Sequence, residues 1–130
     1  MSKTMLVSQI MTPNFKKVDG VTRVADALKI MKEGNVHAML IEPRDNTDVY
    51  GILTLKDIAR KVISQRRKLH ETHVYEIMSK PVLSVPASMP VPYAARLLAN
   101  FSVSYAMVIE NDQVVGMVSL NGIVTNWDLE

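Results

Sequence analysis

The sequence predicts a mixed α/β fold in which two β-α-β-β-α repeats pack about a pseudo-twofold axis. Two observations carry this prediction. Three short motifs occur twice in the same order, and the helical and extended patterns between them also recur. At 130 residues with 48% apolar residues, the chain is about the size of one domain, so neither half would enclose a core comfortably alone. We therefore expect two repeats of one module, residues 1–68 and 69–130.

The repeated motifs are short apolar runs that keep one hydroxyl or acidic residue in place. Their spacing is 67 residues for the first pair and 68 for the second, and such an ordered set indicates an internal repeat. In chain order the pairs are Ile10-Met11-Thr12 with Ile77-Met78-Ser79, Ala38 to Glu42 with Ala106 to Glu110, and Gly51 to Asp57 with Gly116 to Gly122.

In the first half, residues 15–18 predict a short strand, and Thr22 is placed to cap the following helix. Gly34-Asn35 can end that helix. Apolar runs at 36–42 and 49–55 flank a turn rich in Asp and Asn, which predicts a hairpin. Helical spacing marks two buried stripes: Val24, Ala25, Leu28 and Met31 before the hairpin, and Leu55, Ile58, Ala59, Val62 and Ile63 after it.

The second half repeats this order. Ser88 is the expected helix cap, and Pro90 and Pro92 fall in the first turn, where proline does not break a helix. Asn111-Asp112 predicts the hairpin turn. The expected elements are strands at 82–85, 105–110 and 114–120, a helix with Ala94, Leu97 and Leu98 buried, and a short last helix at 121–127.

Composition excludes several classes of protein. The chain has no cysteine, so disulfides, thiolate metal sites and thiol nucleophiles are absent. Its apolar runs fall short of the roughly 18 residues of a membrane span, and the expected location is the cytoplasm. Residues 1–68 hold 13 Lys or Arg against 7 Asp or Glu, a charge of +6, whereas residues 69–130 carry −4. This asymmetry indicates either a first half that attracts anions or self-association between oppositely charged surfaces.

The junction from Thr54 to Asp57 has the chemistry of a nucleotide site. Thr54 follows a strand and opens a helix, where a hydroxyl and free backbone N–H groups favour phosphate. Asp57 lies one turn later on the same side, and its carboxylate can accept hydrogen bonds from both hydroxyls of a ribose. The structural alternative is that Thr54 caps the helix and Asp57 interacts with the helix dipole. The repeat context favours the nucleotide interpretation.

The run Gly51-Ile52-Leu53-Thr54-Leu55-Lys56-Asp57 resembles the signature of the CBS domain, named after cystathionine β-synthase. The resemblance to a tandem CBS pair extends from about Val7 to Trp127. It implies up to two clefts for adenosine-type ligands such as AMP, ADP, ATP, NAD or S-adenosylmethionine. It also implies that each cleft takes its Thr-x-x-Asp from one repeat and its base-contacting strand and loop from the other.

The second of the two clefts implied by the resemblance lacks the ribose-binding aspartate. Ser119 keeps the hydroxyl of the second copy, but Gly122 stands where the first copy has Asp57, so ribose recognition there should be weak. The main site should comprise Thr54, Asp57, Met78, Ser79, Val82, Leu83, Val103, Ser104, Tyr105 and Ala106. The second, degenerate site should comprise Ser119, Met11, Thr12, Phe15, Lys16, Val36, His37 and Ala38.

Other polar residues can be interpreted either as functional or as ordinary structural or solvent-exposed residues. His37 is either a phosphate contact or an ordinary strand residue. His70 and His73 have chelating spacing but lack an obvious third ligand, so we expect no metal. The basic run Arg60, Lys61, Arg66, Arg67 and Lys68 lacks an aromatic stacking platform, which favours a solvated helix end over nucleic-acid binding. Lys16, Lys17 and Lys56 are either phosphate contacts or simply exposed.

The favoured function is a regulatory module that senses adenine nucleotides and signals through conformation or an effector protein. The sequence has neither a catalytic triad order nor paired acids, so we expect no enzyme activity and no catalytic cofactor. The alternative is a structural or partner-binding protein with vestigial clefts. A homodimer is expected through apolar helix positions beyond those that two short sheets can cover, namely Ile58, Val62, Ile63, Ile123, Val124 and Trp127.

Overall fold

The computed structural model describes residues 5–129 and divides into two compact units. The first unit is residues 16–82, and the second unit combines the stretch before residue 16 with residues 83–129. The motif at residues 77–79 therefore packs with the first copy of the repeat, and the motif at residues 10–12 packs with the second. Each compact unit thus contains one short segment that belongs by sequence to the other repeat.

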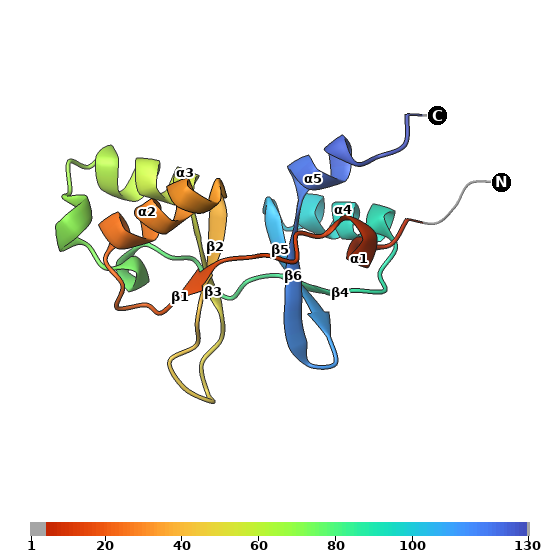
Figure 1. Cartoon of the computed structure of the whole chain (residues 1–130), viewed down its shortest axis with the longest axis horizontal. Helices are drawn as coiled ribbons and strands as arrows, with labels where there is room; N and C mark the ends of the chain where they lie inside the picture. The colour runs from red at the N-terminus through yellow and green to blue at the C-terminus, as the bar shows by residue number, and fades with distance from the viewer. Residues whose placement is uncertain (1–4, 130) are drawn as a thin grey trace. The chain divides into compact units, whose positions relative to one another are not determined.

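The first unit is a three-stranded sheet with helical segments. Its strand order is β1-β2-β3, with β1 parallel to β2 and β2 antiparallel to β3 (Figure 1). The parallel and antiparallel pairs confirm the predicted mixed sheet and hairpin. Its elements are β1 (Lys17–Val18), α2 (Val24–Gly34), β2 (Ala38–Ile41), β3 (Gly51–Thr54), α3 (Leu55–Ile58), a π-helical turn (Ala59–Ile63) and two 3-10 turns (Leu69–Glu71 and Val74–Glu76).

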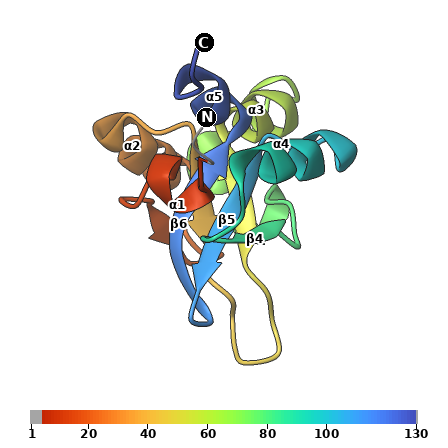
Figure 2. The same cartoon turned by 90° about the vertical axis from the view of Figure 1, so that its right-hand side faces the viewer.

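The second unit repeats the arrangement with the order β4-β5-β6. Figure 2 shows α1 and α4 lying over this sheet. The turn at Asn111 and Asp112 has positive φ at both residues, 53° and 61°, as a tight hairpin turn requires. Its elements are α1 (Val7–Ile10), β4 (Ser84–Pro86), α4 (Val91–Asn100), β5 (Tyr105–Glu110), β6 (Gln113–Ser119) and α5 (Leu120–Thr125).

The side-chain caps predicted for α2 and α4 were both wrong, and for the same reason. Helix α2 starts after Arg23 rather than Thr22, whose hydroxyl donates to Asp19 instead (3.2 Å). Helix α4 starts after Pro90 rather than Ser88. In each case a distant carbonyl binds the first helical amide: Thr72 accepts from Val24 and Met5 accepts from Val91, both at 2.8 Å. The orphan amide is satisfied by main chain, so no side-chain cap is needed.

The end of α2 and the position of Pro92 agree with the sequence, whereas Pro90, predicted in the first turn of α4, is its N-cap residue. Asn35 closes α2 in the left-handed region, with φ 51°. Pro92 lies in the first turn of α4, and the remainder of that helix is unbroken. These features depend on local backbone geometry, which the sequence pattern alone could specify.

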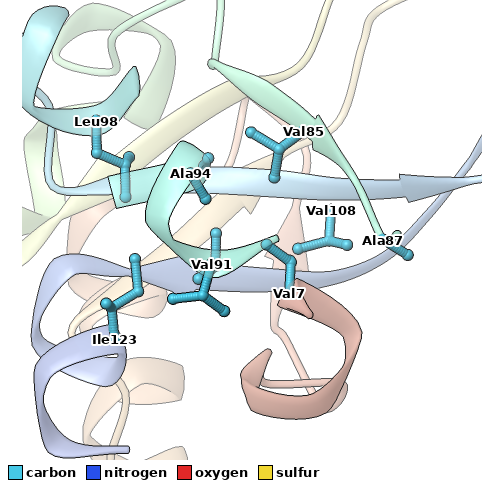
Figure 3. Packing of buried hydrophobic residues seen from close by; sticks show 10 residues of the cluster. Val7, Val85, Ala87, Val91, Ala94, Leu98, Val108 and Ile123 are labelled. Atoms are coloured by element: carbon cyan, nitrogen blue, oxygen red, sulfur yellow. The ribbon is translucent and has the colours of Figure 1, made fainter. Parts of the chain in front are cut away.

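Each unit has its own apolar core. In the second unit, one buried cluster contains Val7 from α1, Val91, Ala94 and Leu98 from α4, and the sheet residue Val108 (Figure 3). In the first unit, the corresponding core includes Val24, Ala27, Met31, Met39, Leu53, Ile58, Val62 and Ile77. Each unit includes a segment that belongs by sequence to the other repeat: the stretch before residue 16 in the second unit and residues 69–82 in the first. We call these the exchanged segments. Because Val7 and Ile77 belong to the two cores, the exchanged segments are integral parts of the units.

The helix positions expected to form a dimer interface are divided by the structure. Ile58, Val62 and Ile123 are buried within the chain, which corrects the expectation that they are available to a second copy. Ile63, Val124 and Trp127 remain exposed. Among residues 5–129, no helix has both the length and the apolar character needed to cross a bilayer.

Candidate functional site

In the first unit, the repeated glycine packs against the repeated methionine. A Cβ added to Gly51 would lie 2.8 Å from Met78 Sδ, so the methionine side chain would have to shift to admit a larger residue. Next to it, the backbones of Ile52 and Ser79 exchange two hydrogen bonds (2.9 and 3.0 Å). The segment at 77–79 therefore lies against β3, two residues before Thr54.

The second unit builds the same junction from the other copies of the motifs. Thr12 and Met117 exchange two backbone hydrogen bonds (2.8 and 3.0 Å). A Cβ added to Gly116 would lie 2.8 Å from Met11 Sδ and 2.9 Å from Thr12 O. The glycine and methionine that recur in the sequence repeat therefore make the same contact in both units.

At the end of β3, Thr54 and Asp57 form a reciprocal capping box. The Asp57 amide donates to Thr54 Oγ1 (3.1 Å), while the Thr54 amide and hydroxyl both donate to Asp57 Oδ2 (3.0 and 2.9 Å). The structural alternative raised by the sequence is therefore present in the molecule. Asp57 Oδ1 takes no part in the box, and the side chain keeps 18% of its surface exposed.

Lys61 is the second partner of Asp57, although the sequence placed it only in the basic run of a solvated helix end. Its ammonium lies 3.5 Å from Asp57 Oδ1 and donates to the carbonyl of Ile77 at 2.9 Å. Asp57 and Lys61 are four residues apart on a helical segment, and this spacing could have predicted the ion pair. The contact with Ile77 had no such signal, because it joins two segments distant in sequence.

The corresponding junction in the second unit is simpler. Ser119 Oγ accepts from the Gly122 amide (2.9 Å), which caps α5. Because Gly122 has no side chain, the return bonds to the amide and hydroxyl of residue 119 are missing. This junction has the hydroxyl of the motif without its carboxylate.

The residues predicted for the main site fall in both units. The first unit carries Thr54, Asp57, Met78, Ser79 and Val82. The second unit carries Leu83, Val103, Ser104, Tyr105 and Ala106; Ala106 is fully buried in its core. The assembly of these two groups into one site stays a prediction.

The second predicted site is divided in the same way. Met11, Thr12, Phe15 and Ser119 lie in the second unit, whereas Lys16, Val36, His37 and Ala38 lie in the first. Within the units, Ala38 pairs with Thr54 across the hairpin and Tyr105 pairs with Ser119. His37 is exposed, and its carbonyl accepts from the Leu55 amide (3.0 Å).

An ion pair holds the chain just beyond Ser79. Lys80 Nζ donates to Asp48 Oδ1 (2.8 Å), and Arg44 approaches Oδ2 of the same carboxylate (3.2 Å). The Lys80 hydrogen bond, followed by backbone donors at Arg44 and Val49, lowers the pKa of Asp48 well below its ordinary value. The hairpin loop between β2 and β3 is thereby tied to the segment that follows the candidate site.

The remaining histidines have structural contacts. The His70 carbonyl accepts from Arg23 (2.6 Å), and His73 stacks on Tyr75 with ring centroids 5.5 Å apart. Glu76 accepts from the His73 amide (2.7 Å) and pairs with Arg67 (2.6 Å). The His73 amide bond, and then the contact with Arg67, lower the pKa of Glu76.

Comparison with known proteins supplies the family and its relatives. The chain is 30% identical over 128 residues to the Arabidopsis thaliana CBS domain-containing protein CBSX3, mitochondrial, covering 91% of this chain and 62% of the relative. It is 28% identical over 120 residues to the Bacillus subtilis CBS domain-containing protein YhcV, covering 92% and 84%. The chain thus spans less than two thirds of the plant relative.

Solved structures agree with the fold. The hexameric CBS-CP12 protein from bloom-forming cyanobacteria is 36% identical with a TM-score of 0.92, covering 98% of this chain and 75% of that chain. The CBS domain pair of protein MJ0100, in complex with 5′-methylthioadenosine and S-adenosyl-L-methionine, is 26% identical with a TM-score of 0.78; coverage is 95% of each chain. The model of the CBS domain matches residues 7–64 and 74–129, so this chain belongs to the CBS domain family and carries two copies of the domain.

Proposed function

We propose that the protein is a regulatory module that binds an adenosine-type ligand, with AMP, ADP or ATP as the first candidates and NAD or S-adenosylmethionine as others. The observation that carries the proposal is the Thr54–Asp57 capping box, because Oδ1 of Asp57 takes no part in it. Membership of a family in which the MJ0100 pair binds adenosine compounds supports it. Binding would change the conformation of the module or its affinity for an effector protein.

In this proposal, Asp57 accepts the ribose hydroxyls. Thr54, Met78, Ser79 and Val82 would line the ligand from the first unit, and Leu83 with residues 103–106 would contribute from the second. Ser119, Met11, Thr12, Phe15, Lys16, Val36, His37 and Ala38 would form the degenerate second site. Since Gly122 offers no carboxylate, we expect one strong site per chain rather than two.

The proposal assigns no catalytic step and no catalytic cofactor. We place the module in the cytoplasm, although the plant relative is mitochondrial. Self-association as a homodimer would provide an output surface, and three of the positions expected to form it are exposed: Ile63, Val124, and Trp127, which follows the end of α5 at Thr125. The cyanobacterial relative is hexameric, so the stoichiometry is a quantity for experiment to decide.

The alternative function is a structural or partner-binding module with vestigial clefts. Gly122 favours it for the second junction, because the ribose acceptor is missing there. The Thr54–Asp57 junction argues against it for the chain as a whole.

Two measurements test the proposal. Mass spectrometry of small molecules released from the heat-denatured protein should detect an adenosine compound, and calorimetry should then give its affinity. Asp57→Asn keeps an acceptor for Thr54 but removes the charge, so we expect adenosine-ligand binding to weaken by about 2 kcal/mol or more. Asp57→Ala is a poorer test because it also removes the capping box.

Equal affinity of the Asp57→Asn and unmodified proteins would contradict the role of Asp57. Failure of AMP, ATP, NAD and S-adenosylmethionine to bind at millimolar concentration would favour the partner-binding alternative. Two equal sites per chain would show that the carboxylate does not distinguish the two junctions.

A further inference from the structure

The hydrogen-bonding capacity of Asp57 is nearly filled before any ligand arrives. An ionised carboxylate offers about four lone-pair positions. Two are used on Oδ2 by the amide and hydroxyl of Thr54, and Lys61 approaches Oδ1. About one position therefore remains, whereas the cis hydroxyls of a ribose donate two hydrogen bonds.

Lys61 is the partner that can leave at least cost. Its 3.5 Å separation from Oδ1 is longer than the 2.9 and 3.0 Å bonds from Thr54, which also hold the start of α3. Its side chain is 43% exposed, so solvent can replace the carboxylate as a partner. The bond from Lys61 to the Ile77 carbonyl (2.9 Å) does not depend on Asp57.

We propose that Lys61 is a latch on the ribose-binding carboxylate, and that ribose displaces its ammonium from Asp57 Oδ1. This inference rests on the proposed function, because it takes Asp57 as the ribose acceptor. Lys61 lies in the π-helical turn after α3, and such turns occur frequently at functional sites. The displaced ammonium stays bonded to Ile77, in the segment that continues into Met78 and Ser79, so occupancy of Asp57 changes the charge balance beside that segment.

The latch has a consequence for specificity. A 2′-deoxyribose donates one hydroxyl and fits the open position with Lys61 in place, whereas a ribose must displace Lys61 to make its second bond. Lys61 therefore reduces the advantage of ribose over 2′-deoxyribose. Removing the ammonium should increase that advantage.

Calorimetry with AMP and 2′-deoxy-AMP tests the displacement. In Lys61→Met, the ratio of the 2′-deoxy-AMP Kd to the AMP Kd should rise about two- to fivefold, the range expected for breaking an exposed ion pair. The ratio cancels the general attraction of a lysine for phosphate, which both nucleotides share. Arg60→Met removes a neighbouring exposed cation and should leave the ratio unchanged.

A double-mutant cycle tests the latch without ligand. Lys61→Met should lower the thermal midpoint more in the unmodified protein than in Asp57→Asn, because the Ile77 contact is lost in both backgrounds and cancels. Additive midpoints would overturn the latch. An unchanged Kd ratio with intact AMP binding would overturn the displacement while sparing the proposed function, whereas no binding of AMP, ATP, NAD or S-adenosylmethionine to the unmodified protein would overturn both.

Discussion

The two strand-to-helix junctions differ chiefly in the carboxylate of Asp57, which Gly122 lacks. Thr54 and Asp57 make three reciprocal hydrogen bonds at the start of α3, whereas Ser119 makes a single cap bond to Gly122 at the start of α5. Both junctions have a glycine in the strand packed against a methionine of the exchanged segment, Gly51 with Met78 and Gly116 with Met11. The scaffold of the site is thus shared by both units, and the carboxylate is not.

This comparison separates two roles of the motif. Backbone pairing at Ile52–Ser79 and Thr12–Met117 holds each segment in place whether or not a carboxylate follows. The carboxylate adds stability in the first unit and, in our proposal, ligand binding. A residue can therefore be lost from one copy without the loss of that unit's fold.

The largest expected effect concerns the two glycines. In Gly116→Ala the new methyl group meets the fixed Thr12 carbonyl at 2.9 Å as well as Met11, whereas in Gly51→Ala the nearest backbone atom, Ser79 O, is 3.4 Å away. Met78 can move its flexible end, but the Thr12 carbonyl moves only with its backbone, which is hydrogen-bonded to Met117. We expect losses of about 3 kcal/mol for Gly116→Ala and about 1 kcal/mol for Gly51→Ala.

Chemical denaturation of the two variants, compared with the unmodified protein, measures these losses. Equal destabilisation would mean that the closer approach of the Thr12 carbonyl adds nothing to the cost of Gly116→Ala.

A smaller effect should follow from restoring the missing carboxylate. Gly122→Asp places an acid at the third position of α5, where it can complete the box with Ser119 and replaces a glycine in a helix. Its Cβ would lie 3.0 Å from Ser119 Oγ, so the serine must shift slightly, as Thr54 and Asp57 show is compatible with a capping box. We expect a gain of about 1 kcal/mol in stability.

Denaturant titration measures that gain, and AMP calorimetry of the same variant tests whether a second site appears. Gly122→Ala is the matched control, because it supplies the Cβ and helix propensity without the carboxylate. A Gly122→Asp protein no more stable than Gly122→Ala would show that the box does not form.

The smallest effect should be an opposite pH response of the two units. Hydrogen bonds lower the pKa values of Asp48, Glu76 and Asp45, all in the first unit: chiefly from Lys80 to Asp48, the His73 amide to Glu76, and Thr47 to Asp45. Stability contributed by a depressed carboxyl pKa is present above about pH 4 and is lost as the pH falls below it. The first unit should therefore lose stability first in acid.

In the second unit, burial raises the pKa of Tyr105. Its contribution is complete below about pH 10 and is lost as the pH rises through the raised value. NMR peak intensities followed from pH 7 to 3 and from pH 8 to 11 would resolve the two responses. Asp48→Asn should lessen the acid response, and identical acid responses of both units would contradict the assignment.

Much of the fold could be predicted because it is encoded locally. The repeat, the order of strands and helices, the end of α2 at Asn35 and the Asn111-Asp112 turn follow from apolar periodicity and backbone preferences within a few residues. The Thr54–Asp57 junction was found in the same way, because three residues on a helix fix which side chains meet.

Tertiary structure decided what depends on chain segments that are distant in sequence. Helices α2 and α4 begin later than predicted because the carbonyls of Thr72 and Met5, rather than the predicted side-chain caps, bind their first amides. The exchange of residues 77–79 and 10–12 between units, and the bond from Lys61 to Ile77, depend on packing that periodicity does not encode. Sequence alone therefore pointed to Thr54 and Asp57, while folding brought Lys61 to Asp57 and determined which hydrogen-bonding positions on that carboxylate remain open, because that depends on every donor that packing brings within reach.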